Sequence, residues 1–141
     1  MPDESTILLA EDDSNDALLV RKALEMTVPH HRMFHVSDGQ KCIDYLAGNA
    51  PFSDRAQFPI PNLLLLDLKM PVVSGFEVLS WLQEHRDLKS LPVVILTGSI
   101  LARDAQEAAV RGATEFYVKP VEVGELIKIM QALGSRWLTR F

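Results

Sequence analysis

Carboxylate, hydroxyl and ammonium side chains stand directly after short apolar runs of this 141-residue chain. They are Glu11, Asp12, Asp13, Asp67, Thr97 and Lys119. Several carboxylates that crowd together repel one another unless a cation joins them. Mg²⁺ prefers carboxylate oxygens together with waters and phosphate oxygens, and a lysine and a hydroxyl can donate to the same phosphate. These residue types therefore indicate a Mg²⁺-dependent phosphoryl-transfer site, provided that the fold brings the ends of the runs together.

A carboxylate can itself attack phosphorus and form an aspartyl phosphate, while a metal and a lysine stabilise the charge on the transferred group. The residue types alone do not decide which acid is the nucleophile. Each of these residues also has an ordinary explanation when it is taken alone. The acidic triplet at 11–13 could be a turn before a helix, Thr97 could be a strand residue, and Lys119 could be a solvated surface charge. Their common position after apolar runs favours the site.

The elements that must position these residues follow from the hydrophobic pattern. The pattern predicts strands at residues 6–10, 33–37, 62–67, 92–97 and 114–118, each followed by a helix. The four leucines at 63–66 do not alternate with polar residues, which is typical of a parallel strand with both faces covered. Ser14 is expected to cap the first helix. Five strand–helix units predict one α/β domain, in which ligands bind at the carboxyl ends of the strands.

Composition limits the class of protein. The chain is 48% hydrophobic and 23% charged, which is globular, and its length suits one domain. A single cysteine, Cys42, excludes an internal disulfide and a cysteine-rich zinc site. The net charge of −5 argues against nucleic acid as a partner. The N-terminus lacks the pattern of a signal peptide and no apolar run could span a bilayer, so we expect a cytoplasmic protein without a membrane partner.

Three segments outside the strand pattern are expected to make contacts or to move. Residues 49–61 contain three prolines and form a long loop, either an insertion or a contact surface. The helix at 102–111 offers only alanines to the core, so it should shift easily. Beyond a domain at 5–134, residues 135–141 should extend the last helix. Apolar side chains there would fold back on the sheet or form a homodimer through the last helix and tail: Met130, Leu133, Trp137 and Phe141.

The full set of motifs resembles the receiver domain of bacterial two-component response regulators. The resemblance covers about residues 5–134 and rests on ILLAEDD at 7–13, LLLDLKMP at 64–71 with Gly75, VILTG at 94–98 and FYVKP at 116–120. It implies a doubly wound, flavodoxin-like (βα)5 sandwich with parallel sheet order 2-1-3-4-5. It also selects Asp67 as the phosphoacceptor.

The resemblance implies a role for each of the other residues as well. The Mg²⁺ ligands would be Glu11, Asp12, Asp67 and the backbone carbonyl of Lys69. Thr97 would hydrogen-bond the phosphoryl group and Lys119 would form an ion pair with it. Thr97 and Phe116 would act as switch residues, although an aromatic at 116 is equally plain core. The family also has a cis bond at the position of Lys119–Pro120.

The implied function is signalling. Asp67 would accept a phosphoryl group from a phosphohistidine of a sensor histidine kinase, and the output would be a protein–protein contact, with no enzymatic activity beyond this transfer and autodephosphorylation. The loop at 49–61 and the tail at 134–138 resemble those of small regulators paired with bacterial phytochromes, which implies a bacteriophytochrome as the kinase.

Other classes of protein fit part of the sequence. A phosphorylation-independent receiver-like adaptor would share the fold, but no acid, threonine or lysine of the site is missing. A small phosphatase with an aspartyl-phosphate intermediate would place an acid two residues after the nucleophile, where Lys69 stands. A flavin-binding protein would need a phosphate-binding loop after the first strand, where this chain is acidic.

Overall fold

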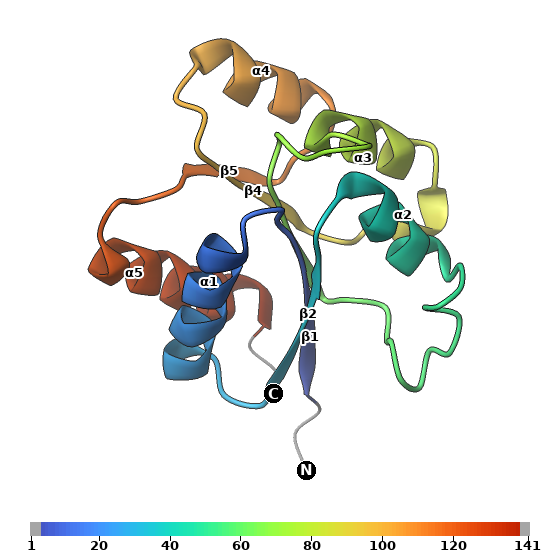
Figure 1. The fold of residues 1–141 in the computed structure, drawn as a ribbon, viewed down its shortest axis with the longest axis horizontal. Helices are drawn as coiled ribbons and strands as arrows, with labels where there is room; N and C mark the ends of the chain where they lie inside the picture. Colours follow the sequence, from blue (N-terminus) through green and yellow to red (C-terminus); the bar gives the residue numbers. More distant parts are fainter. Residues whose placement is uncertain (1–3, 139–141) are drawn as a thin grey trace.

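A five-stranded parallel sheet lies between two layers of helices in the computed structural model, which describes residues 4–138 (Figure 1). The strands are β1 (Ser5–Ala10), β2 (His31–Val36), β3 (Leu63–Leu66), β4 (Val93–Thr97) and β5 (Glu115–Val118). The helices are α1 (Ser14–Thr27), α2 (Gly39–Ala47), α3 (Gly75–Gln83), α4 (Ala102–Val110) and α5 (Val123–Leu133), with short helices η1 (Arg86–Leu88) and η2 (Gly134–Leu138). The order β2-β1-β3-β4-β5 confirms the predicted fold class.

The two helix layers bury alternate residues of the same strands. Figure 1 shows α1 and α5 together on one side of the sheet, with α2, α3 and α4 on the other. Ile7 and Leu9 belong to the core that α1 and α5 cover, whereas Leu8 and Ala10 belong to the core under α2 and α3. All six residues of β1 and all four of β3 are buried, so the absence of alternation in the sequence reflects two covered faces.

Polar side chains fix where the helices begin. Asp13, not Ser14, caps α1, because its carboxylate accepts hydrogen bonds from two backbone amides of the first turn and Ser14 is already helical. Asp38 caps α2 and Ser74 caps α3 in the same way. Gly48 ends α2 with φ of 76°, a conformation that favours glycine.

Helix α4 is held more weakly than the other long helices. Ala108 is its one buried residue, while Ala105 is partly exposed and Ala109 is exposed, so its contact with the sheet is narrower than the sequence suggested. Its N-terminus has no side-chain cap. Just beyond its C-terminus, Arg111 donates to the backbone carbonyl of Phe76 and to the hydroxyl of Ser80 on α3. In its first turn, Asp104 accepts a hydrogen bond from the hydroxyl of Ser99, so a few polar contacts near each end and the burial of Ala108 hold the helix.

The proline-rich loop at 49–61 is anchored by an aromatic cluster and by one arginine. Rings of Phe52 and Phe58 pack against Tyr45 of α2, and Phe58 also packs against Phe34 of β2, with ring centres 5.2–6.0 Å apart. Arg55 donates to the carbonyls of Tyr45 and Leu46 at the end of α2 and to that of Phe58. The loop is thus bound to α2 and β2 along its length.

The tail continues α5 and returns to the sheet. Met130 and Leu133 are buried in the core against α1 rather than on a free face. Trp137 donates its indole N–H to the carboxylate of Glu115 at 2.7 Å, and Leu138 is buried. Ser5 donates its hydroxyl to the carbonyl of Leu138, which ties the tail to the start of β1. Phe141 lies outside the described residues.

Two further observations bear on the sequence-based expectations. The cis peptide bond among the described residues is Ala50–Pro51, and Lys119–Pro120 is trans, contrary to the expectation from the family. No helix within residues 4–138 is long and apolar enough to cross a membrane.

Candidate functional site

Three charged residues of the predicted site each follow a strand directly and remain bonded to the neighbouring strand through the backbone: Glu11, Asp67 and Lys119. The amide of Glu11 donates to Val36 of β2 at 3.0 Å, and the amide of Asp67 donates to Ala10 of β1 at 3.1 Å. The amide of Lys119 donates to Thr97 of β4 at 2.7 Å. The three charged residues are therefore held at the carboxyl end of the sheet as rigidly as the strands themselves, as the sequence predicted.

The loop between β3 and α3 brings a helix N-terminus against the backbone of Asp67. The amide of Gly75 donates to Leu68 at 2.9 Å. A Cβ at position 75 would lie 2.2 Å from the carbonyl oxygen of Asp67, so this approach requires glycine. Within the same loop, Val72 has φ of 68° and is 78% exposed, a rare conformation for a β-branched residue.

Three carboxylates form a cluster that could hold a metal ion. One oxygen from each of Glu11, Asp12 and Asp67 lies within 4.8 Å of the others. Glu11 and Asp67 are 2% and 5% exposed, whereas Asp12 faces solvent. The amide of Lys69 donates to Asp67 Oδ1 at 3.4 Å, while the side chain of Lys69 is exposed. Oxygen donors of this kind suit a hard divalent cation that keeps part of its water shell.

The ammonium group of Lys119 contacts three carboxylates at once. Its Nζ lies 2.7 Å from Glu11 Oε1, 2.8 Å from Asp16 Oδ2 and 3.1 Å from Asp67 Oδ2. Burial alone would lower the pKa of Lys119, but hydrogen bonds to these carboxylates outweigh burial and raise that pKa well above its usual range. Lys119 is therefore a permanent cation in the acidic cluster.

The charge balance of the cluster favours a further cation. Burial raises the pKa of Glu11 to about 7, helped by the negative charge of Asp67 and opposed by Lys119 and by the amide of Asp13. One ammonium group is thus not enough to keep the buried glutamate fully ionised at neutral pH. A divalent cation among these oxygens would favour the ionised form, so the donor set fits Mg²⁺.

Asp16 is a contact of the site that the sequence pattern did not single out. It lies in the first turn of α1, and its carboxylate contacts the ammonium group of Lys119 at the carboxyl end of the sheet. A useful signal was its place in the first helical turn after the acidic triplet, which keeps it at the same end of the sheet. His35 was also missed: its Nε2 lies 2.7 Å from the backbone oxygen of Glu11, next to the cluster.

Thr97 and Phe116 take different positions relative to the acidic cluster. Thr97 ends β4, is 1% exposed and accepts a 3.4 Å hydrogen bond from the amide of Ser99. Ser99 in turn donates to the carboxylate of Asp104 on α4. Phe116 is half-buried, pairs with Ile95 in the sheet register and packs on the core beneath α2 and α3. A chain of contacts therefore leads from Thr97 to α4.

Comparison with known proteins assigns the chain to a family. Residues 7–131 match the response regulator receiver domain family. The chain belongs to this family. That assignment confirms the resemblance found in the sequence.

Solved structures of phytochrome and bacteriophytochrome response regulators are among the similar proteins. The receiver is 33% identical to response regulator Rcp1 of Synechocystis, over 98% of this chain and 95% of Rcp1. It resembles the structure of the phosphorylated cyanobacterial phytochrome response regulator RcpA with a TM-score of 0.88 and 29% identity, over 96% of this chain and 95% of that one. The receiver also resembles the structure of the Mn²⁺-bound form of Rcp1, with a TM-score of 0.85 and 31% identity, over 97% of this chain and 96% of that one.

Proposed function

We propose that this receiver accepts a phosphoryl group on Asp67 from a phosphohistidine of a sensor histidine kinase in a Mg²⁺-dependent reaction, and then signals by contact with a downstream protein. One observation carries the proposal: Lys119 Nζ lies between Glu11 and Asp67, in a site where three carboxylates lie within 4.8 Å. Such a site joins a nucleophile, a metal-binding donor set and a fixed cation.

The residues have distinct roles in this reaction. An oxygen of Asp67 forms a bond to phosphorus while the bond between phosphorus and the imidazole nitrogen breaks. Glu11, Asp12, Asp67 and the backbone carbonyl of Lys69 would hold Mg²⁺, which when bound neutralises charge on the transferred group. Lys119 is already beside Asp67 and pairs with the phosphoryl oxygens as they arrive.

Thr97 and Phe116 are the residues that we expect to convey the change. A phosphoryl oxygen would accept a hydrogen bond from the hydroxyl of Thr97. The same hydroxyl accepts a hydrogen bond from the amide of Ser99, which lies in the loop before α4. Because α4 buries only Ala108 and has no N-terminal side-chain cap, it is the helix that rearranges at the lowest cost. Amide exchange in α4 should therefore be faster than in α5 and should change on phosphorylation. Equal rates in the two helices would contradict this step.

The partner kinase is proposed to be of the phytochrome class. The support is the similarity to RcpA, a phytochrome response regulator, over nearly the whole chain. A homodimer through α5 and the tail also stays a prediction. In such a dimer, the indole N–H of Trp137 would remain bonded to Glu115 of its own chain. A monomer mass that does not change with concentration or phosphorylation would exclude the homodimer.

Intact mass measurement tests the phosphoryl transfer. The protein is incubated with acetyl phosphate, either with Mg²⁺ or with a chelator. We expect one phosphoryl adduct that requires Mg²⁺, is absent from Asp67→Asn and persists in Asp87→Asn, which alters an exposed acid on η1. If no adduct forms, a panel of phosphorylated sensor kinases is tried next. Failure of every kinase would favour the adaptor that works without phosphorylation.

A further inference from the structure

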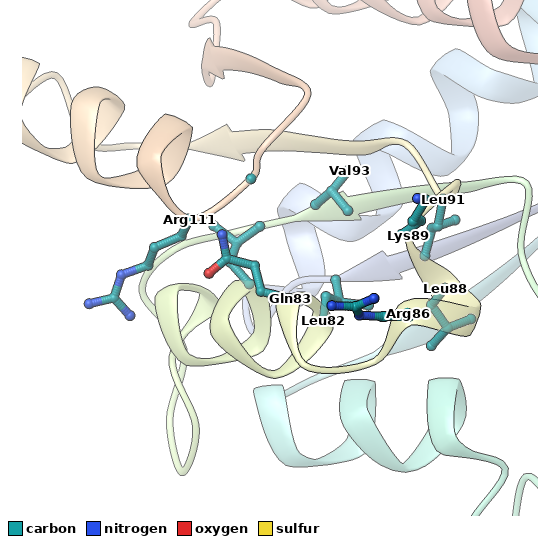
Figure 2. A pocket seen from close by; sticks show the side chains of 10 residues that line it. Leu82, Gln83, Arg86, Leu88, Lys89, Leu91, Val93 and Arg111 are labelled. Carbon is teal, nitrogen blue, oxygen red and sulfur yellow. The ribbon is translucent and has the colours of Figure 1, made fainter.

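A hollow of about 330 Å³ lies at the end of the sheet opposite the acidic cluster (Figure 2). It is bounded by α3, by η1 and the segment after it, by Val93 at the start of β4 and by Gly112 just before β5. These are the amino ends of the strands, whereas Asp67 and Lys119 follow carboxyl ends. The hollow is therefore separate from the proposed phosphorylation site.

The floor of the hollow is aliphatic. Five side chains from α3, η1, the segment after η1 and β4 form it: Leu79, Leu82, Leu88, Leu91 and Val93. Its volume is at the lower end of the range found for ligand pockets, large enough for one large apolar side chain. Its mouth is open to solvent, because the side chains of Gln83, Arg86 and Lys89 are exposed. A free small molecule would leave much of its surface in water there.

Two cations at the mouth have no ionic partner among residues 4–138. Arg86 and Lys89 both line the hollow and form no ion pair with a described residue. Arg111 also lines it, but Figure 2 shows its guanidinium pointing away from the other lining side chains, toward its partners on α3. The acids of the same segment, Glu84 and Asp87, are not part of the lining. The mouth of the hollow is thus positive on a chain whose net charge is −5.

We propose that this hollow binds an acidic segment of a partner protein, which inserts one large apolar side chain while flanking carboxylates pair with Arg86 and Lys89. The aliphatic floor would bury the inserted apolar side chain, and the two cations would fix the orientation of the bound segment. A protein segment fits better than a free ligand because its own backbone covers the open mouth. The interaction goes beyond the proposed phosphorylation, and it requires no phosphoryl group because the two sites are at opposite ends of the sheet.

A synthetic peptide tests the site. The probe is the acetylated and amidated pentapeptide Glu-Asp-Phe-Asp-Glu, titrated into the ¹⁵N-labelled protein and followed by amide resonances. We expect saturable shifts at residues 79–93 and at Gly112. The double variant Arg86→Gln/Lys89→Gln should bind at least tenfold more weakly, as should the neutral peptide Gln-Asn-Phe-Asn-Gln. Lys22→Gln, which removes an exposed cation of α1, should bind like the wild type.

The controls separate this proposal from the function proposed above. Both altered cations are exposed, so the double variant should fold, and its circular dichroism should match that of the wild type. Asp67→Asn should bind the peptide normally, even though it cannot be phosphorylated. Shifts elsewhere, or equal binding of the neutral peptide, would overturn the proposal. Octanoate binding as tightly as the peptide would assign the hollow to a free amphipathic anion instead.

Discussion

Lys119 Nζ lies 2.7 Å from Glu11 Oε1, so the residue that follows β5 contacts the residue that follows β1. Because β3 and β4 separate these strands in the sheet, this ion pair spans the carboxyl end of four strands. Asp67, after β3, contacts the same ammonium group. The cation that would bind a phosphoryl group therefore also offsets part of the negative charge around Asp67, the proposed phosphoacceptor.

Replacing this cation should destabilise the protein most when no metal is present. In Lys119→Gln the buried carboxylates of Glu11 and Asp67 lose their partner, which costs about 2 kcal/mol of unfolding free energy. This is below the cost for a fully buried pair because the Lys119 side chain is 21% exposed. Urea unfolding with chelator and with Mg²⁺ measures it, and Mg²⁺ should reduce the loss. Lys128→Gln, at a 74% exposed side chain, is the control and should change little.

Gly75→Ala should disturb the site through the backbone. The added Cβ would lie 2.2 Å from the carbonyl oxygen of Asp67 and 2.7 Å from the Cα of Leu68, so α3 or the loop must move. We expect a loss of about 1–3 kcal/mol in unfolding free energy and slower phosphorylation by acetyl phosphate. Gly124→Ala on α5 meets nothing within 4 Å and should instead gain about 0.5–1 kcal/mol, as alanine does in a helix. Equal effects would argue against the steric cause.

Val72→Gly should stabilise the protein. Val72 has φ of 68° and is 78% exposed, so the substitution removes an unfavourable backbone conformation and little buried surface. A gain of about 1 kcal/mol in unfolding free energy is expected. Removing the strained conformation is worth about 1–3 kcal/mol, but glycine also raises the conformational entropy of the unfolded chain, which offsets part of the gain. Thermal unfolding compares it with Val121→Gly, an exposed position without positive φ, which should show no gain.

The buried phenol of Tyr45 should make stability fall in alkali. Burial raises the pKa of Tyr45 from 10.0 to about 12, and the hydroxyl donates to the carbonyl of Pro59. The folded protein keeps the neutral phenol, so its contribution is complete below pH 10 and decreases from there to about pH 12, by about 2–3 kcal/mol in all. Urea unfolding across this range should show a steeper loss in the wild type than in Tyr45→Phe. Parallel curves would contradict the effect.

The sequence predicted the strand ends well because that information is local. Four leucines before Asp67, or an apolar run before Thr97, place the polar residue at the end of a covered strand, and parallel pairing then collects such ends on one edge. Asp16 was missed because it looks like any acid in a helical first turn. Its contact with Lys119 depends on how α1 packs, which no short motif contains.

Contacts between distant and aperiodic segments were also beyond the sequence pattern. The loop at 49–61 has no repeat that would indicate Phe52 and Phe58 packing on Tyr45. Where the tail meets β5, hydrogen bonds from Trp137 and Arg136 of the tail and from Tyr117 of β5 converge on Glu115. Burial alone would raise the pKa of that carboxyl, but these hydrogen bonds lower it. The sequence allowed a folded-back tail, but these particular contacts appear only in the packed structure.

The anchoring of the proline-rich loop determines how a protease would treat this protein. A long loop with an arginine at its centre is normally an early site for trypsin, which must bind an extended, accessible segment around the scissile bond. Here the guanidinium of Arg55 is bonded to carbonyls at the end of α2, and the aromatic rings on both sides of it are packed. Cleavage after Arg55 in the native protein therefore has to wait until the loop separates from the domain, and its rate reports that opening.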